Sequence, residues 1–237
     1  MMLKLNIVGR RRPGTTLAEH RRHIRDVHGE LVLRFIRTDA TNAPQRYVQN
    51  PVYDGAYRVS APDRDPLALG CDFVTQIWVA DFNALERSRK TDFYLTHLQS
   101  DEDRFVDQST VIFLPSHERE IASSGPIATG AWKLFVLFQR APGVEPAAFS
   151  SAWAQAAQAA SPVALRHVQN DVLGRPGAVL PVDAIDEFWF DEEAAAHAHL
   201  STWQAVLHTS LIQSGLALAG SIAAVIARED VIHSGAV

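Results

Sequence analysis

Apolar and polar side chains alternate along several short stretches of the first 120 residues, the pattern of strands that bury one face. Four segments carry this alternation or a short apolar run: residues 3–10, 45–50, 72–79 and 109–114. The period changes to that of an amphipathic helix from Leu17 and again from about Asn83, where an interruption is expected near Thr91. The pattern therefore predicts the order strand, helix, strand, strand, helix, strand.

The first of these helices carries three histidines. Thr16 followed by Glu19 is a capping box, so the helix is expected to begin there, after the turn at residues 13–14. At about 100° per residue, one stripe faces the interior, and it consists of Leu17, His20, Ile24, Val27, His28 and Leu31. His23 lies about 140° from His28 on an ideal helix, so their rings are not expected to act on one ligand.

The second half of the chain repeats the first. Three blocks align with each other: residues 3–14 with 132–143, residues 46–50 with 166–170, and residues 72–79 with 183–190. The elements of the second copy are therefore expected at residues 131–139, 147–160, 165–172, 184–190, 192–207 and 220–227. In this alignment His20 corresponds to Phe149, and His28 corresponds to Ala157.

The predicted order of elements is that of the ferredoxin-like β-α-β-β-α-β unit, in which both helices cover one face of an antiparallel sheet. The uncovered face needs a partner, and two such sheets in one chain can cover each other. We therefore expect an α+β fold with one repeat at residues 1–120, a linker at 121–130 and a second repeat at 131–237. Residues 54–70 are expected to form a loop.

Composition narrows the classes of function. Of the 237 residues, 47% are hydrophobic and 21% are charged, with a net charge of -5, which suits a globular protein and not a nucleic-acid binder. The single cysteine, Cys71, cannot form an internal disulfide and is expected to be a small buried side chain. With no signal peptide recognised, a cytoplasmic protein is expected. The apolar run at residues 211–227 is punctuated by polar residues and glycines, so we expect a core segment and not a membrane span.

Several motifs together resemble an EthD-type domain of the dimeric α+β barrel superfamily. These are the Arg12-Pro13-Gly14 turn, the helix end Val27-His28-Gly29, the strands at residues 46–50 and 72–78, and the acidic segment 101–107. The second copy lacks the helix histidine and the acidic segment. The resemblance implies that the two copies pack sheet to sheet as an intramolecular barrel, with a small-molecule cavity between each sheet and its helices or loops.

The same resemblance implies classes of activity. Relatives include cofactorless lyases, dehydratases, decarboxylases and cyclases that act on aromatic or polyketide-like carbonyl compounds. We therefore expect no cofactor and no metal, and a small apolar or aromatic substrate as the partner. A homodimer of barrels is compatible with the resemblance, whereas nucleic-acid and membrane partners are not expected.

His28 is the residue on which the predicted site depends. The resemblance maps the family's histidine and glycine onto His28 and Gly29, and the change to Ala157 fits a function kept in one copy only. A neutral imidazole in an apolar pocket can accept a proton, so His28 is predicted to be a general acid or base, with a satisfied core histidine as the alternative. His20 is predicted to be a core residue or a substrate contact.

Further residues complete the predicted site. Tyr47 is predicted to be catalytic, and Gln49 and Asn50 to contact substrate, because hydroxyl and amide groups can hold an oxyanion; strand-edge hydrogen bonding is the alternative. His97 is a second catalytic candidate, because the second copy has Leu207 there. Four aromatic side chains are predicted to contact a planar ligand, with core packing as the alternative: Trp78, Phe93, Tyr94 and Phe105.

These observations predict a cofactor-independent enzyme that transfers protons on an apolar carbonyl or phenolic compound. Two alternatives stay open at this point. One is a non-catalytic ligand-binding or stress protein with the same fold, and the other is a cofactorless monooxygenase acting on an electron-rich substrate. The sequence contains no Gly-x-Ser-x-Gly elbow, P-loop or Gly-x-Gly-x-x-Gly motif.

Overall fold

A computed structural model describes residues 2–59, 65–160, 164–174 and 179–235. The chain divides into two compact units. Unit 1 consists of Met1–Pro51, Cys71–Pro115 and Glu229–Val237. Unit 2 consists of Val52–Gly70 and Ser116–Arg228. Each unit therefore contains a segment from the opposite half of the sequence.

The sheet of unit 1 is built mainly from strands of the first half of the chain. β1 (Leu3–Arg11) pairs antiparallel with β3 (Phe73–Val79), and β3 pairs antiparallel with β2 (Arg46–Ala56). β4 (Val106–Ser123) lies on the other side of β1. The resulting order, β4-β1-β3-β2, is the one that a ferredoxin-like unit requires. β9 (Asp230–His233) continues this sheet beyond β2.

The first helical segment of unit 1 changes its hydrogen-bond pattern in the middle. It runs through α1 (Leu17–Arg22), the π-helix η1 (His23–His28) and α2 (Gly29–Thr38). The predicted capping box is confirmed: the Thr16 hydroxyl accepts a hydrogen bond from the Glu19 amide, and the Glu19 carboxylate accepts one from the Thr16 amide. The helix therefore begins where the sequence indicates.

The π-helix makes part of the predicted buried stripe wrong. A π-helix closes each turn with an i→i+5 hydrogen bond, so it holds one more residue per turn and shifts the buried face along the chain. Val27, expected inside, is 42% exposed. Leu17 is also 38% exposed, but it lies at the start of α1, before the π-helix. The buried positions of this segment include His20, Ile24, His28, Val32 and Phe35.

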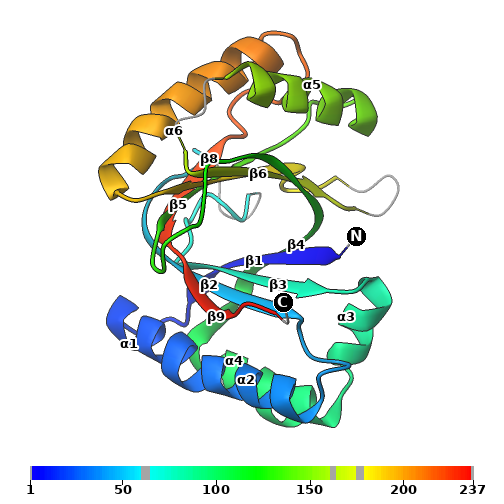
Figure 1. The fold of residues 1–237 in the computed structure, drawn as a ribbon, viewed down its shortest axis with the longest axis vertical. Coiled ribbons are helices and arrows are strands. Elements are labelled where there is room, and N and C mark those ends of the chain that lie inside the picture. The colour runs from blue at the N-terminus through cyan, green and yellow to red at the C-terminus, as the bar shows by residue number, and fades with distance from the viewer. Residues whose placement is uncertain (1, 60–64, 161–163, 175–178, 236–237) are drawn as a thin grey trace. The chain divides into compact units, whose positions relative to one another are not determined.

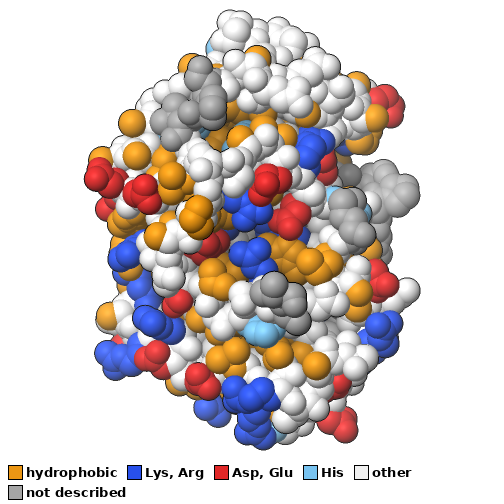
Figure 2. All heavy atoms as spheres, in the orientation of Figure 1, with side chains coloured by type: hydrophobic (Ala, Val, Ile, Leu, Met, Phe, Trp, Pro, Cys, Tyr) orange, Lys and Arg blue, Asp and Glu red, His pale blue; other side chains and the backbone are white. Residues whose placement is uncertain are grey.

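The second helical segment of unit 1 is interrupted near Thr91, as predicted. α3 (Phe82–Ser88) is followed by the π-helix η2 (Tyr94–Leu98) and then by α4 (Gln99–Phe105). Both helical segments lie on the same face of the sheet of unit 1 (Figure 1), and their outer surface carries charged side chains (Figure 2). This is the arrangement that amphipathic helices need in order to bury their apolar faces.

The elements of unit 2 lie close to their predicted bounds. Its central strands are ordered β6 (Arg166–Val172), β7 (Ala184–Phe190), β5 (Trp132–Phe138) and β8 (Ala223–Arg228), all antiparallel to their neighbours. Its helices are α5 (Pro146–Ala159) and α6 (Glu193–Leu207), and α6 continues into the π-helix η3 (His208–Ile212). The α+β class is thereby confirmed.

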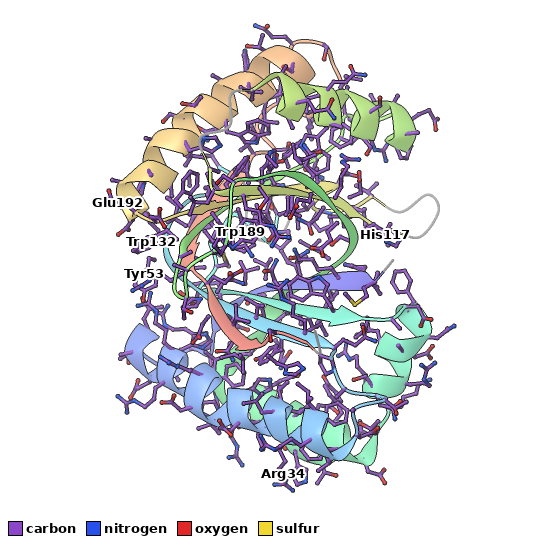
Figure 3. The ribbon with its side chains drawn as sticks, in the orientation of Figure 1. Arg34, Tyr53, His117, Trp132, Trp189 and Glu192 are labelled. Carbon is purple, nitrogen blue, oxygen red and sulfur yellow. The ribbon has the colours of Figure 1, made fainter. Side chains whose placement is uncertain are left out.

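Two strands continue further than the sequence predicts. Residues Val52–Ala56 of β2 pair with β8, and Tyr53 packs edge-on against Trp132 with 5.3 Å between ring centroids (Figure 3). The predicted loop at residues 54–70 therefore begins later, and its residues 60–64 lie outside the described residues. β4 pairs with β6 as far as Ser123, so it enters the segment predicted to be a linker.

Equivalent side chains make the same contact in the two units. Gln49 Nε2 donates a hydrogen bond to the carbonyl oxygen of Ile24 at 2.6 Å. Gln169 Nε2 donates to the carbonyl oxygen of Trp153 at 3.2 Å. In both units this bond ties the second strand to the first helix.

The residue just before the third strand of each unit, β3 and β7, is also held by the same kind of hydrogen bond. The backbone amide of Arg11 donates to the Asp72 carboxylate, and the backbone amide of Arg140 donates to the Asp183 carboxylate. The structure thus gives these aspartates a shared contact at the strand start.

The remaining expectations about the fold concern burial. Cys71 is buried, as predicted. The apolar run at residues 211–227 forms the end of η3, a turn and most of β8. Within the part of the chain that the structure describes, every helix is too short or too polar to cross a membrane.

Candidate active site

Two cavities lie in unit 1 and share part of their walls. The first has a volume of about 60 Å³ and the second a volume of about 90 Å³. Both are lined by Ile7, His28, Tyr47, Thr75, Glu102 and Phe113. The rest of the walls is mainly aliphatic and aromatic, so the few polar groups stand in a largely apolar space.

His28 is held at these cavities by the last turn of η1 and by an aspartate from α4. Its Nδ1 lies 3.1 Å from Oδ2 of Asp101, which is 73 residues further along the chain. An ionised carboxylate can only accept, so Nδ1 carries the proton and the lone pair of the neutral ring is on Nε2. Nε2 has no hydrogen-bond partner among the described residues. His28 therefore presents a proton acceptor to the cavities.

Asp101 is a buried carboxylate that two histidines share. Its side chain is 5% exposed; Oδ1 accepts from His23 Nε2 at 2.9 Å, while Oδ2 faces His28. Burial favours the neutral acid, but the hydrogen bonds from His28 and His23 outweigh burial and hold the pKa of Asp101 below its usual value. Asp101 therefore stays ionised and can stabilise a positive charge on His28.

The prediction that His23 and His28 point apart is wrong, and the π-helix is the reason. In an α-helix, residues five apart project in different directions. The i→i+5 turn of η1, closed by the Gly29 amide bonding to the Ile24 carbonyl, brings residues five apart to one side. His23 and His28 consequently meet the same carboxylate.

Tyr47 contributes a hydroxyl to both cavities. Its oxygen accepts a hydrogen bond from Gln49 Nε2 at 2.8 Å, and Gln49 also binds the Ile24 carbonyl. Burial raises the pKa of the Tyr47 hydroxyl above its usual value, so the group stays protonated. Because Gln49 occupies the oxygen as a donor, the Tyr47 proton is available to an acceptor in the cavity.

Glu102 is the second carboxyl group at the cavities. The Tyr94 hydroxyl lies 3.2 Å from its Oε1 and 3.3 Å from its Oε2. Burial raises the pKa of Glu102, although the charge of His28 and the bond from Tyr94 oppose this. Adjacent residues of α4 thus provide one carboxylate that is held ionised and one carboxyl group that keeps its proton more readily.

The structure places four of the ten predicted site residues on the cavity walls: His28, Tyr47, Tyr94 and Phe105. The other six are not among the lining residues: His20, Gln49, Asn50, Trp78, Phe93 and His97. Gln49 still reaches the site indirectly, because it fixes the hydroxyl of Tyr47.

His97 and Phe93 pack against each other and α2 instead of facing the cavities. The His97 ring meets the edge of Phe93 at 4.8 Å, and Phe93 stacks on Phe35 at 5.1 Å. η2 is the physical reason, because its wider turn changes which side chains of this segment face the sheet.

The remaining residues off the cavities have structural contacts. His20 Nδ1 hydrogen-bonds to the carbonyl of Phe105. Asn50 Nδ2 donates to the Val74 carbonyl, as Asn170 Nδ2 donates to the Ile185 carbonyl in unit 2. Trp78 has the cations of two residues over its ring, Lys4 and Arg46. These contacts fit the packing alternatives that the sequence left open.

Sequence reasoning did not identify Asp101 and Glu102 as site residues. Both belong to the acidic segment 101–107, which entered only as part of a family resemblance. The signal available was the loss of this segment in the second copy together with the loss of the histidine at position 28. Within the described ranges, no group of three or more His, Cys, Asp or Glu side chains is arranged to hold a metal ion.

The corresponding region of unit 2 holds a different cluster. Asp186, at the position that aligns with Thr75, accepts hydrogen bonds from Trp153 Nε1 at 3.0 Å and Trp203 Nε1 at 2.8 Å. His167, which aligns with Tyr47, lies 2.7 Å from the same carboxylate. Asp186 is fully buried, and bulky side chains surround it.

Comparison with known proteins confirms the resemblance over residues 12–109, which match the EthD domain. An anthrone oxidase-like protein of known structure has a TM-score of 0.52 at 14% identity, covering 98% of this chain and 91% of that chain. A mutant chlorite dismutase from Candidatus Nitrospira defluvii has a TM-score of 0.54 at 8% identity, covering 97% and 92%. A provisionally named monooxygenase from Fusobacterium nucleatum has a TM-score of 0.55 at 7% identity, covering 100% and 96%. At these identities the likeness shows the fold alone, and no curated protein matches the sequence.

Proposed function

We propose that the EthD domain at residues 12–109 makes this chain a cofactor-independent enzyme that transfers a proton on a small apolar carbonyl or phenolic compound. One observation carries the proposal: His28 lines an apolar cavity with Nδ1 bonded to a buried, ionised Asp101, and no described residue bonds to its Nε2. This is the arrangement of a general base that is oriented and charge-stabilised by a carboxylate.

The proposed reaction begins with transfer of a substrate proton to Nε2 of His28. The imidazolium that forms is stabilised by Asp101, which lies on the other side of the ring. Negative charge then develops on the carbonyl or phenolic oxygen, and the Tyr47 hydroxyl is the donor that meets it. Glu102 is the second group of the site that can hold a proton, because its carboxyl group retains a proton more readily than that of an exposed glutamate.

We also infer that the two units descend from one ferredoxin-like unit. Gln49 and Gln169 make equivalent hydrogen bonds, each within its own unit, and so do Asp72 and Asp183. These two matches support the duplication. The replacement of Tyr47 by His167 and of His28 by Ala157 supports chemistry in unit 1 only.

The test is proton exchange in D₂O, followed by NMR, on a panel of small ketones, β-dicarbonyl compounds and phenols. The unaltered protein is expected to exchange an acidic hydrogen of at least one compound, and His28→Gln is expected to slow this by about 100-fold or more. His97→Gln is the control, because His97 is a histidine of the same unit that lines neither cavity.

The thermal stability of each variant decides how a loss of exchange is interpreted. His28→Gln should keep a melting temperature near that of the unaltered protein. Exchange retained in His28→Gln would refute the role of His28 in catalysis. A panel that binds without exchange would support a ligand-binding protein instead.

Cofactorless monooxygenation is the second candidate. A base that removes a phenolic proton produces an electron-rich anion, and a protein of similar fold bears the name of a monooxygenase. Oxygen uptake with a phenolic substrate separates the two reactions, because proton transfer alone consumes no O₂.

A further inference from the structure

Arg89 lines the second cavity, and the proposed proton transfer does not use it. It follows α3 directly, and its backbone amide caps that helix by bonding to the carbonyls of Arg87 and Leu85. Its side chain is exposed, and its guanidinium carbon lies 5.7 Å from the ring centroid of Tyr94 and 5.1 Å from that of Phe113. Two aromatic rings of the cavity therefore hold the guanidinium near the cavity wall.

The guanidinium of Arg89 has no ion pair with a carboxylate among the described residues. Its neighbour Lys90, by contrast, pairs with Glu86 at 2.6 Å. Its charge does act on two neighbours in the cavity: burial raises the pKa values of Glu102 and Tyr94 above their usual values, and Arg89 lowers both in part. Arg89 is thus a planar fork of donors beside the cavity that forms no ion pair with a carboxylate of the described residues.

The cavity beside Arg89 determines what else a ligand must contain. Its volume of about 90 Å³ is far below the roughly 300–1,000 Å³ of drug-sized pockets, so it suits a single ring or a short alkyl chain. Most of its wall is aliphatic or aromatic, including Leu5, Val32, Phe35, Ile77, Leu85 and Leu98. An apolar body can be buried there while a charged end remains near the surface.

Tyr94 connects the cation to the proposed reaction centre. Its ring contacts Arg89, and its hydroxyl hydrogen-bonds to Glu102, which lines the same cavity as His28. A ligand with one end at Arg89 and its body in the cavity therefore lies beside the groups proposed to move protons.

We propose that the ligand of the second cavity is a small carboxylate with a one-ring or short-chain apolar body, whose anionic group pairs with Arg89. This inference rests on the proposed function and deepens it by naming the substrate class: the carbonyl or phenolic compound on which His28 acts also carries a carboxylate.

The test is a binding experiment with matched pairs of probes that differ only in charge. Benzoate and benzamide, and hexanoate and hexanamide, are titrated calorimetrically into the full chain at pH 7.5. The unaltered protein is expected to bind at least one carboxylate about tenfold more tightly than its amide. Arg89→Gln is expected to reduce this preference to about twofold or less, with the affinity for the amide unchanged.

Two control variants make the result specific. Arg87→Gln removes an exposed arginine from the end of α3, two residues before Arg89, that does not line the cavity, and it should keep the full preference. His97→Gln changes a histidine of the same unit that lines neither cavity, and it should also keep the preference. The charge preference is measured by binding and the role of His28 by proton exchange, so the inference can fail while the catalytic proposal stands, and the reverse is equally distinguishable.

Three results would overturn the inference. The first is equal affinity for carboxylate and amide in the unaltered protein, and the second is an undiminished preference in Arg89→Gln. The third is the absence of measurable binding by every carboxylate of the panel. A preference lost equally in Arg87→Gln would assign the effect to general surface charge and would also contradict a role specific to Arg89.

Discussion

At the scale of the single residue, Asp101 explains how the candidate base can work in an apolar cavity. An imidazolium in such a space is unstable unless a negative charge lies next to it. Asp101 is buried, yet it stays ionised because two histidines donate to it, so the charge is ready before any substrate arrives. The hydrogen bonds of one carboxylate thus define the tautomer and the orientation of His28.

A second residue, His199 of α6, leads to a prediction about pH and stability. It is 7% exposed, and neither ring nitrogen has a hydrogen-bond partner among the described residues. Burial, with a smaller contribution from His167, lowers its pKa to about 4. An unfolded histidine titrates near pH 6.5, so on acidification the unfolded chain binds a proton first, and stability falls between about pH 6.5 and pH 4.

His199→Leu is expected to remove this loss, which amounts to about 3 kcal/mol by pH 4. Urea denaturation at pH 7.5 and pH 4.5 should show a larger gain in the free energy of unfolding at the lower pH. His197→Gln, on the exposed side of the same helix, is the control and should show no such pH dependence. A gain of equal size at both pH values would contradict the assignment to His199.

At the scale of the element, the π-helix η1 decides which side chains reach the site. It brings His23 and His28 to one carboxylate, and it moves Val27 out to solvent. Gln49 from β2 donates to the Ile24 carbonyl inside the same turn, so the strand and the irregular helix hold each other in place. π-helical turns occur often at functional sites for this kind of reason.

His23 is therefore expected to position Asp101, and this gives a prediction at the same scale. His23→Leu removes one of the two donors to Asp101 and should lower kcat about tenfold with little change in KM. His23→Gln, whose amide can donate to the same oxygen, should recover most of the rate. Arg22→Gln, one residue earlier and exposed, is the control. A similar loss in His23→Gln and His23→Leu would show that more than the hydrogen bond is involved.

At the scale of the whole molecule, the two units differ in what they hold at the aligned positions. Unit 1 has cavities at the helix-covered face of its sheet, where His28, Tyr47 and Glu102 meet. At the aligned positions of unit 2, Asp186 is satisfied by Trp153, Trp203 and His167. A buried carboxylate with that many partners stabilises one arrangement of its neighbours and leaves little capacity for a ligand.

Asp186→Asn should therefore act on stability and not on chemistry. It breaks a buried pair with His167 and weakens two indole hydrogen bonds, so the free energy of unfolding should fall by about 3 kcal/mol. At a temperature where the variant is fully folded, its proton-exchange rate should equal that of the unaltered protein. Denaturation curves and exchange rates on the same sample check both statements; loss of exchange in folded protein would place chemistry in unit 2 as well.

The sequence predicted much of the fold because most of its signals are local. Alternation identified the strands, the Thr16–Glu19 box marked the start of a helix, and the internal alignment located the elements of unit 2. It also pointed to His28 and Tyr47, which do lie on the cavities. His97 and Phe93, which were also predicted to belong to the site, line neither cavity and lie at the π-helical turn η2.

What the sequence determined by itself was the order of the elements and the apolar face of each one, since a period of two or 3.6 residues follows from backbone geometry. Only the tertiary structure decided which polar groups meet. His28 and Asp101 are 73 residues apart, and the π-helical turn that carries His28 is held by a bond from Gln49 to the Ile24 carbonyl. Arg89 likewise became a candidate only when Tyr94 and Phe113 were found beside it at a cavity. Contacts of this kind depend on how segments that are distant in sequence pack together, and a local sequence pattern carries no information about that packing.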